Sequence, residues 1–191
     1  MNMKQKQIEF LLVIAISASI SAFSQISSAQ DFKPVSQDIL NNPDPEDWLM
    51  WRGSYENWGY SPLTEINHDN VDQLRLAWSW EFSPAAPGSN GMQVEPTVYD
   101  GVIYIRHSDE KYSAHNAATG DLIWQYSRIL AAEVAGYETQ LTVHRGRGVF
   151  IYEDKLISHS TDGMLFALNP RDGSLIWEVA MQDFRSGQQP S

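Results

Sequence analysis

One motif occurs twice in the chain, at a fixed spacing of 53 residues. The first copy, Ala-His-Asn-Ala-Ala-Thr-Gly-Asp-Leu-Ile-Trp, covers residues 114–124, and the second, Ala-Leu-Asn-Pro-Arg-Asp-Gly-Ser-Leu-Ile-Trp, covers residues 167–177. The positions that keep their register are Ala114, Gly120 and Trp124, and Ala167, Gly173 and Trp177. Self-similarity at a fixed period indicates a repeat fold, in which each unit covers the apolar faces of its neighbours.

Short strand-like segments separated by turns surround both copies of the motif. Branched and aromatic residues favour strands, whereas glycine, aspartate and asparagine mark the turns between them. The predicted strands cover residues 97–99, 102–105, 122–126, 149–152, 155–158, 164–168 and 175–179. Residues 76–82 alternate apolar with polar side chains and predict a further strand, while residues 64–74 suit a capped helical turn.

Roughly four strands per repeat of this length is the pattern of a β-propeller blade. A β-sandwich also has short strands at regular spacing and is the alternative. Because the motif recurs without a gap, we expect an all-β propeller with tryptophan-docking blades, of which only the first two to three are present. Two or three blades leave apolar faces uncovered at both ends. We therefore expect the chain to be part of a longer protein.

Packing explains the residue types of the motif. Gly120 and Gly173 permit tight turns with positive φ, where a side chain is unfavourable. The tryptophan four residues later can lie flat between adjacent blades, against a small alanine of the neighbouring unit. We therefore expect Trp124 and Trp177 to hold blades together rather than to contact a substrate.

The first 29 residues have the features of a secretory signal peptide. Lys4 and Lys6 precede an apolar run over residues 10–22, and Ser27 and Ala29 frame a small-x-small cleavage site. The run is shorter than the roughly 20 residues that span a bilayer. We expect a periplasmic protein without a membrane anchor, in which residues 30–47 form an irregular arm and residues 48–191 an incomplete propeller.

The net charge and the absence of cysteine argue against several classes of ligand and site. Thirteen basic and 24 acidic residues give a net charge of -11, which disfavours nucleic acid and anionic membrane surfaces as ligands. There is no cysteine, so neither a disulfide nor a cysteine-based metal site can form. The five histidines show no metal-ligand spacing.

The element Ala-x-Asn-x-x-x-Gly-x-x-x-Trp resembles the tryptophan-docking motif of the eight-bladed quinoprotein alcohol and methanol dehydrogenases, which use pyrroloquinoline quinone (PQQ). A more specific likeness lies in residues 47–78, here called the leading segment, which resembles the sequence before the first complete blade of those enzymes. The matching positions are Asp47-Trp48, Tyr60-Ser-Pro-Leu-Thr-Glu-Ile-Asn67, Asn70-Val71, Leu74 and Ala77-Trp78.

The resemblance implies oxidation of an alcohol in the periplasm, with a cytochrome c as electron acceptor. PQQ would lie on the propeller axis with Ca²⁺ or a lanthanide ion acting as a Lewis acid. Two residues that contact PQQ in the family align with Gln93 and Arg147 of this chain. The family has a glutamate at the position of Gln93. Glu95, two residues further on, is a second candidate for that contact. An adjacent cysteine pair of the family is replaced by Leu141 and Thr142.

The family's metal ligands and catalytic aspartate fall in later blades, so we expect them beyond Ser191 and expect this fragment to be inactive alone. A non-catalytic propeller that binds other proteins, like the PQQ-repeat lipoprotein of outer-membrane barrel assembly, is the alternative function. The uncharged Gln93 and the absent cysteine pair keep this alternative open.

Overall fold

The computed structural model describes residues 32–81, 94–107, 110–130, 148–181 and 183. The predicted signal peptide over residues 1–29 lies outside this part of the chain and stays a prediction. Residues 32–191 form one compact unit.

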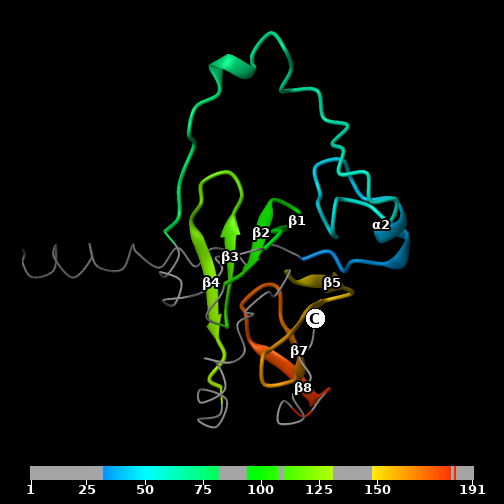
Figure 1. The fold of residues 1–191 in the computed structure, drawn as a ribbon, viewed down its shortest axis with the longest axis vertical. Helices are drawn as coiled ribbons and strands as arrows, with labels where there is room; N and C mark the ends of the chain where they lie inside the picture. The colour runs from blue at the N-terminus through cyan, green and yellow to red at the C-terminus, as the bar shows by residue number, and fades with distance from the viewer. Residues whose placement is uncertain (1–31, 82–93, 108–109, 131–147, 182, 184–191) are drawn as a thin grey trace, which may run out of the picture. The chain divides into compact units, whose positions relative to one another are not determined.

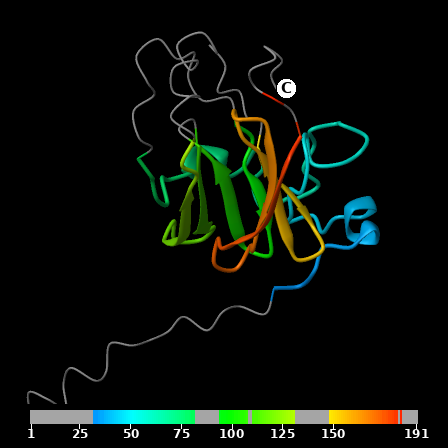
Figure 2. The same cartoon turned by 90° about the horizontal axis from the view of Figure 1, so that it is seen from below.

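Two antiparallel sheets of four strands build this unit, each in sequential order (Figures 1 and 2). The first contains β1 (Thr97–Tyr99), β2 (Val102–Arg106), β3 (Lys111–Asn116) and β4 (Leu122–Ser127). The second contains β5 (Phe150–Tyr152), β6 (Lys155–His159), β7 (Met164–Leu168) and β8 (Leu175–Ala180). The all-β prediction of four-stranded units is therefore confirmed.

The two sheets repeat each other down to their irregularities. Ala114 lies opposite Trp124 in β3 and β4, and Ala167 lies opposite Trp177 in β7 and β8. The register shifts directly after the alanine in both sheets, which is the position of a β-bulge. The sequence repeat is thus a repeat of three-dimensional units.

The prediction of a strand over residues 76–82 was wrong for its described part, because residues 76–81 are not assigned to a strand. A strand needs a neighbour for its backbone hydrogen bonds, and these residues have no ladder partner within the described ranges. Conversely, β3 was missed in the first copy, since Lys111, Ser113 and His115 give it a polar composition. Its repeat partner β7 is the apolar segment that was predicted.

Two short helices lie in the N-terminal part of the unit. The region predicted as an irregular arm contains α2 (Gln37–Asn41), whose N-cap Ser36 accepts a hydrogen bond from the Ile39 backbone. The predicted helical turn is present as the 3₁₀-helix η1 (Val71–Gln73). Neither helix, nor any other in the described residues, is long and apolar enough to cross a bilayer.

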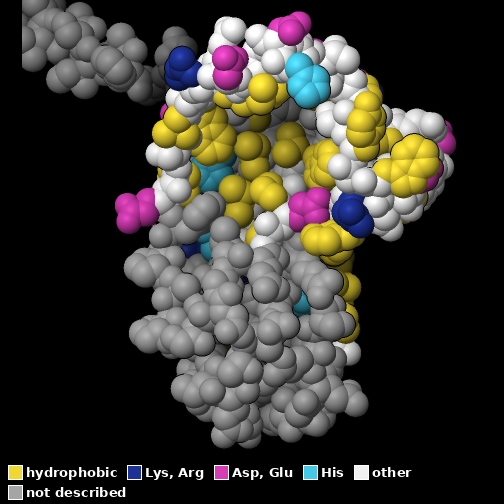
Figure 3. Space-filling view, turned by 45° about the horizontal axis from the view of Figure 1, so that its top comes forward, with side chains coloured by type: hydrophobic (Ala, Val, Ile, Leu, Met, Phe, Trp, Pro, Cys, Tyr) yellow, Lys and Arg dark blue, Asp and Glu magenta, His cyan; other side chains and the backbone are white. Residues whose placement is uncertain are grey.

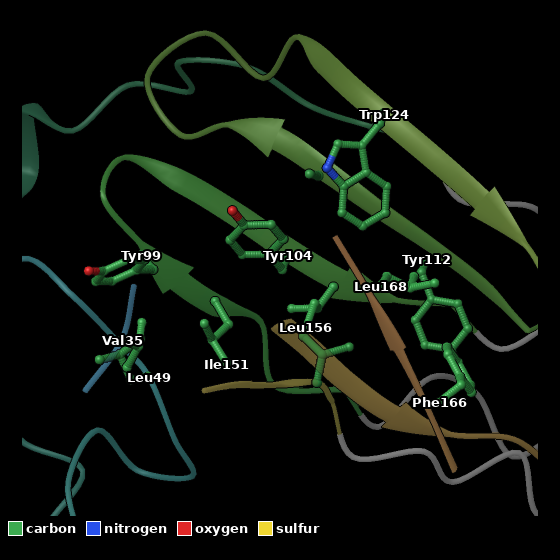
Figure 4. Packing of buried hydrophobic residues seen from close by; sticks show 12 residues of the cluster. Val35, Leu49, Tyr99, Tyr104, Tyr112, Trp124, Ile151, Leu156, Phe166 and Leu168 are labelled. Carbon is green, nitrogen blue, oxygen red and sulfur yellow. The ribbon is translucent and has the colours of Figure 1, made fainter. Parts of the chain in front are cut away.

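The core lies between the two sheets and contains large aromatic side chains (Figure 4). Tyr112 of β3 meets Phe166 of β7 edge to face, with ring centroids 5.2 Å apart. Such a pair contributes about 0.5–1.5 kcal/mol beyond the burial of its area. Val35 and Leu49 extend this core toward the N-terminal part of the unit.

Charged groups also join the sheets. Glu110 and Arg106 form an ion pair of 3.1 Å, and each side chain is 3% exposed. The Glu110 carboxylate also accepts hydrogen bonds from the Tyr112 hydroxyl (3.2 Å) and from the backbone N–H of Thr161, before β7 (3.2 Å). Arg128, which directly follows β4, forms ion pairs with two acidic residues of the second sheet: Asp162, before β7, and Glu178 of β8. These contacts fix one unit against the other.

Candidate functional site

Each motif glycine lies directly beneath a tryptophan ring. A Cβ added to Gly173 would come within 2.5 Å of Trp124 Cε3, so a larger residue cannot keep this packing. Trp124 Nε1 donates a hydrogen bond of 2.8 Å to the Pro170 carbonyl in the same turn. Gly120 and Gly173 have φ of +77° and +71°, which confirms the predicted turn conformation.

The alanines of the motif act within a sheet, since Ala114 is the cross-strand partner of Trp124. In the neighbouring unit the ring of Trp124 meets the turn of Gly173. Trp124 thus packs on glycine and a backbone carbonyl of the neighbouring unit, and not on an alanine of that unit as the sequence suggested. The docking role of Trp177 stays a prediction.

A third docked tryptophan, Trp78, was missed by sequence reasoning. A Cβ on Gly120 would lie 2.6 Å from Trp78 Cδ2, and Trp78 Nε1 donates to the Ala117 carbonyl at 3.0 Å. The signal that could have found it is Trp78 itself, which precedes Trp124 by 46 residues, somewhat less than the 53-residue repeat.

A pocket of about 220 Å³ opens where β1 and β5 begin. Its lining residues are Met50, Trp51, Glu95, Pro96, Thr97, Val149 and Phe150. The two strands meet closely here, because Thr97 Oγ1 donates a buried hydrogen bond of 2.7 Å to the Val149 carbonyl. Gly148 allows this approach, since a Cβ at that position would lie 2.9 Å from the Glu95 carbonyl oxygen.

Glu95 is held in place by the leading segment. One oxygen of its carboxylate, Oε1, accepts hydrogen bonds from Trp48 Nε1 at 2.5 Å and from the Arg52 backbone at 3.0 Å. Trp48 also bridges Val98 of β1. The carboxylate thus ties the start of β1 to residues 48–52 while facing the pocket.

The other predicted cofactor residues, Gln93 and Arg147, lie outside the described residues, as do Leu141 and Thr142. Their chain neighbours do not: Val94 precedes Glu95, and Gly148 follows Arg147 directly. The segments that flank both candidates therefore converge on the pocket.

The pocket offers aromatic surface to a planar ligand, whereas its charge disfavours an anionic one. Trp51 and Phe150 are 55% and 57% exposed, so aromatic surface is available to cover a flat ring. Glu95 is the one charged residue among its described lining residues. A ligand bearing carboxylates would be repelled by Glu95 unless a cation joined the site. In the chain, Arg147 comes two residues before the lining residue Val149.

Metal ligands do not gather in the described part of the chain. No three histidine, aspartate or glutamate side chains come together there in a way that could hold an ion.

Four-stranded sheets joined by docked tryptophans, with a pocket where their first strands converge, define a β-propeller of the tryptophan-docking class. Residues 48–187 match the family described as PQQ, glucose/ethanol/alcohol dehydrogenase, β-propeller domain. The chain belongs to this family.

Two known proteins are similar to this chain in sequence, and one solved structure is similar to it in fold. The dehydrogenase subunit of a quinone alcohol dehydrogenase from Gluconobacter oxydans (strain 621H) is 33% identical over 88% of this chain. The quinohemoprotein alcohol dehydrogenase ADH IIB of Pseudomonas putida is 32% identical over 72% of it. The structure of ADHIIG from Pseudomonas putida HK5 superposes on 80% of the chain with a TM-score of 0.69 and 28% identity.

The matches cover only part of each relative. The chain spans 22% of the Gluconobacter subunit, 19% of ADH IIB and 22% of the ADHIIG structure. The family match, residues 48–187, includes both repeat units and all of the leading segment except Asp47.

Proposed function

We propose that this chain is the N-terminal part of a periplasmic PQQ-dependent dehydrogenase that oxidises alcohols to aldehydes or ketones and passes electrons to a cytochrome c. The observation that carries the proposal is the family match over residues 48–187, in a chain whose pocket lies where the first strands of both units begin. Export is supported by the signal-peptide pattern of residues 1–29.

Arg147 and Gln93 would hold the cofactor. A guanidinium supplies paired donors for carboxylate and quinone oxygens, and it would offset the negative charge of Glu95 at the pocket. Gln93 would add an uncharged hydrogen bond. Glu95 would act through its contacts with Trp48 and Arg52, by keeping the start of β1 in place beside the ligand.

Bound PQQ would supply the two-electron acceptor that alcohol oxidation requires. Ca²⁺ or a lanthanide ion would accompany it, with ligands and the catalytic base from polypeptide outside residues 1–191. The contribution of the present residues is to bind and orient the cofactor and to cover it with aromatic surface. The fragment alone is therefore proposed to be inactive.

The test uses the full-length protein with Arg147→Leu. We expect PQQ affinity to fall about thirtyfold or more, because truncating one partner of a charged hydrogen-bonded pair costs about 2 kcal/mol or more. PQQ absorbance during titration measures binding, and a dye-linked assay with Ca²⁺ measures alcohol oxidation.

The matched control is Arg75→Leu, since Arg75 is exposed and, within the described residues, donates to the nearby Asp72 and Leu74 carbonyls. Its PQQ affinity should equal that of the wild type. A full-length wild-type protein that neither binds PQQ nor oxidises any alcohol would refute the proposal and support the protein-binding propeller instead.

A further inference from the structure

The pocket at the starts of β1 and β5 has three walls, each from a different part of the chain. Residues 50–51 of the leading segment form the first wall, and residues 95–97 at the start of β1 form the second. Residues 149–150 at the start of β5 form the third. Because the walls are far apart in sequence, the width of the pocket depends on the contacts that join them in space.

Two polar side chains join these walls. Glu95 joins the first wall to the second, since its carboxylate accepts hydrogen bonds from Trp48 Nε1 and from the Arg52 backbone. Thr97 joins the second wall to the third, since its Oγ1 donates a buried hydrogen bond of 2.7 Å to the Val149 carbonyl. In the part of the chain that the structure describes, no other hydrogen bond links the starts of these two strands.

Apolar contacts do not set the distance between the walls. Hydrophobic side chains are common on this molecule, as Figure 3 shows for those gathered around a hollow on one face. The burial of apolar surface is not directional, whereas a hydrogen bond has a narrow range of lengths and angles. Gly148 lets the two backbones come close but has no side chain to hold them there. The Thr97 hydroxyl is therefore the group that fixes the second wall against the third.

The repeat indicates that this hydrogen bond is not a general part of the joint between units. Thr97 corresponds to Phe150, 53 positions later, and each is the first residue of the first strand in its sheet. A phenyl ring has no hydrogen-bond donor, and Phe150 is 57% exposed, whereas Thr97 is 4% exposed. The tryptophan joint does recur, because Trp78 and Trp124 each donate to a backbone carbonyl. The Thr97 hydroxyl thus belongs to the pocket and not to the repeat.

We propose that Thr97 is a positioning residue for the ligand of this pocket, because its hydroxyl holds the start of β5 at the distance from β1 at which both walls contact the ligand. This inference rests on the proposed function, in which the ligand is PQQ. Thr97 acts through the Val149 carbonyl and needs no contact with the ligand. Without the hydroxyl, this buried carbonyl loses its donor, and the wall that contains Phe150 is no longer fixed. A binding site needs its contacts held within about 0.5 Å, so such freedom lowers affinity.

Thr97→Val in the full-length protein removes the hydroxyl and keeps the branched shape of the side chain. We expect its PQQ affinity, measured by absorbance titration, to fall about tenfold. Thr97→Ser keeps the donor and should bind PQQ as tightly as the wild type. Rescue by serine would show that the hydrogen bond, and not the packing of the methyl group, positions the wall. PQQ affinity of Thr97→Val equal to that of a wild type that binds PQQ would overturn the proposal.

Tyr112→Phe is the matched control for a loss of stability alone. The Tyr112 hydroxyl lies 3.1 Å from the His159 carbonyl oxygen, so it also joins a hydroxyl of the first unit to a carbonyl of the second. Tyr112 is fully buried and is not a lining residue of the pocket. Tyr112→Phe should therefore lower stability in urea, as Thr97→Val does, but leave PQQ affinity unchanged. Equal losses of PQQ affinity in both variants would indicate a purely structural role for Thr97 and would refute its positioning role.

Hydrogen exchange of the full-length protein without PQQ separates this inference from the proposed function. In Thr97→Val, residues 148–150 should exchange faster than in the wild type, with residues 155–159 of β6 as the internal reference. Thr97→Ser should leave this exchange unchanged. A wild type that binds no PQQ would refute the proposed function, and faster exchange in Thr97→Val would then still support the positioning of this wall by Thr97. Exchange in Thr97→Val equal to that of the wild type would overturn the inference whether or not PQQ binds.

Discussion

Gly173→Ala tests the close packing of Trp124 on its turn. The added Cβ would lie 2.5 Å from Trp124 Cε3 and 2.8 Å from Cδ2, both on the fused ring system. Atoms of a rigid ring cannot yield as the end of a flexible side chain does. The ring must therefore move, which weakens its hydrogen bond to the Pro170 carbonyl.

The expected cost has two parts. A left-handed conformation costs an alanine roughly 1–2 kcal/mol, and overpacking adds about 1–3 kcal/mol. Gly101→Ala provides the control, because Gly101 has a φ of +72° but no atom within 4 Å of an added Cβ. Gly173→Ala should thus destabilise the protein by about 2–5 kcal/mol and Gly101→Ala by only about 1–2 kcal/mol.

Urea unfolding of the full-length variants, followed by tryptophan fluorescence, measures both costs. A double-mutant cycle adds Trp124→Leu, in whose background Gly173→Ala should cost no more than Gly101→Ala. Equal destabilisation by Gly173→Ala and Gly101→Ala in the wild-type background would refute the packing argument.

Two further predictions concern the buried polar groups between the sheets. Glu110→Gln leaves the buried Arg106 charge without its partner and should cost about 3–5 kcal/mol in urea unfolding, whereas Asp154→Asn at an exposed pair should change little. A loss equal to that of Asp154→Asn would contradict this. Burial, and then the Arg106 cation, lower the pKa of His159 below its usual 6.5. Its neutral form stabilises the fold above that pH, and this contribution is lost as the pH falls through the lowered value. His159→Gln should therefore lose less stability than the wild type on acidification below pH 6.5, and identical pH profiles would argue against it.

The repeat made most of the fold predictable, because a fixed period carries information that local composition lacks. The second copy has apolar strands such as β7, which stand out in the sequence. In the first copy, β3 contains Lys111, Ser113 and His115, and only the register of the repeat could have revealed it. Residues 76–82 illustrate a strand prediction that failed in its described part. Their alternating sequence indicates a strand, but a strand forms only where a neighbour accepts its backbone hydrogen bonds.

The site was predictable only in outline. Glu95 was identified as a candidate through the family resemblance, as the carboxylate two residues after Gln93, but its partner Trp48 lies 47 residues away in the chain. A hydrogen bond between residues so far apart in the chain cannot be predicted from a local sequence pattern. The pocket itself arises because Gly148 lets two strands approach, which depends on the packing of separate units.

The tryptophan joint places few demands on the sequence of the turn that receives it. Its hydrogen bond ends on a backbone carbonyl, so the residue that supplies the acceptor is alanine at 117 in one unit and proline at 170 in the next. Only the glycine must be retained, because any side chain at its position would collide with the tryptophan ring. Duplicated units can therefore diverge at most turn positions and still assemble, which leaves those positions free to acquire new surface chemistry during evolution.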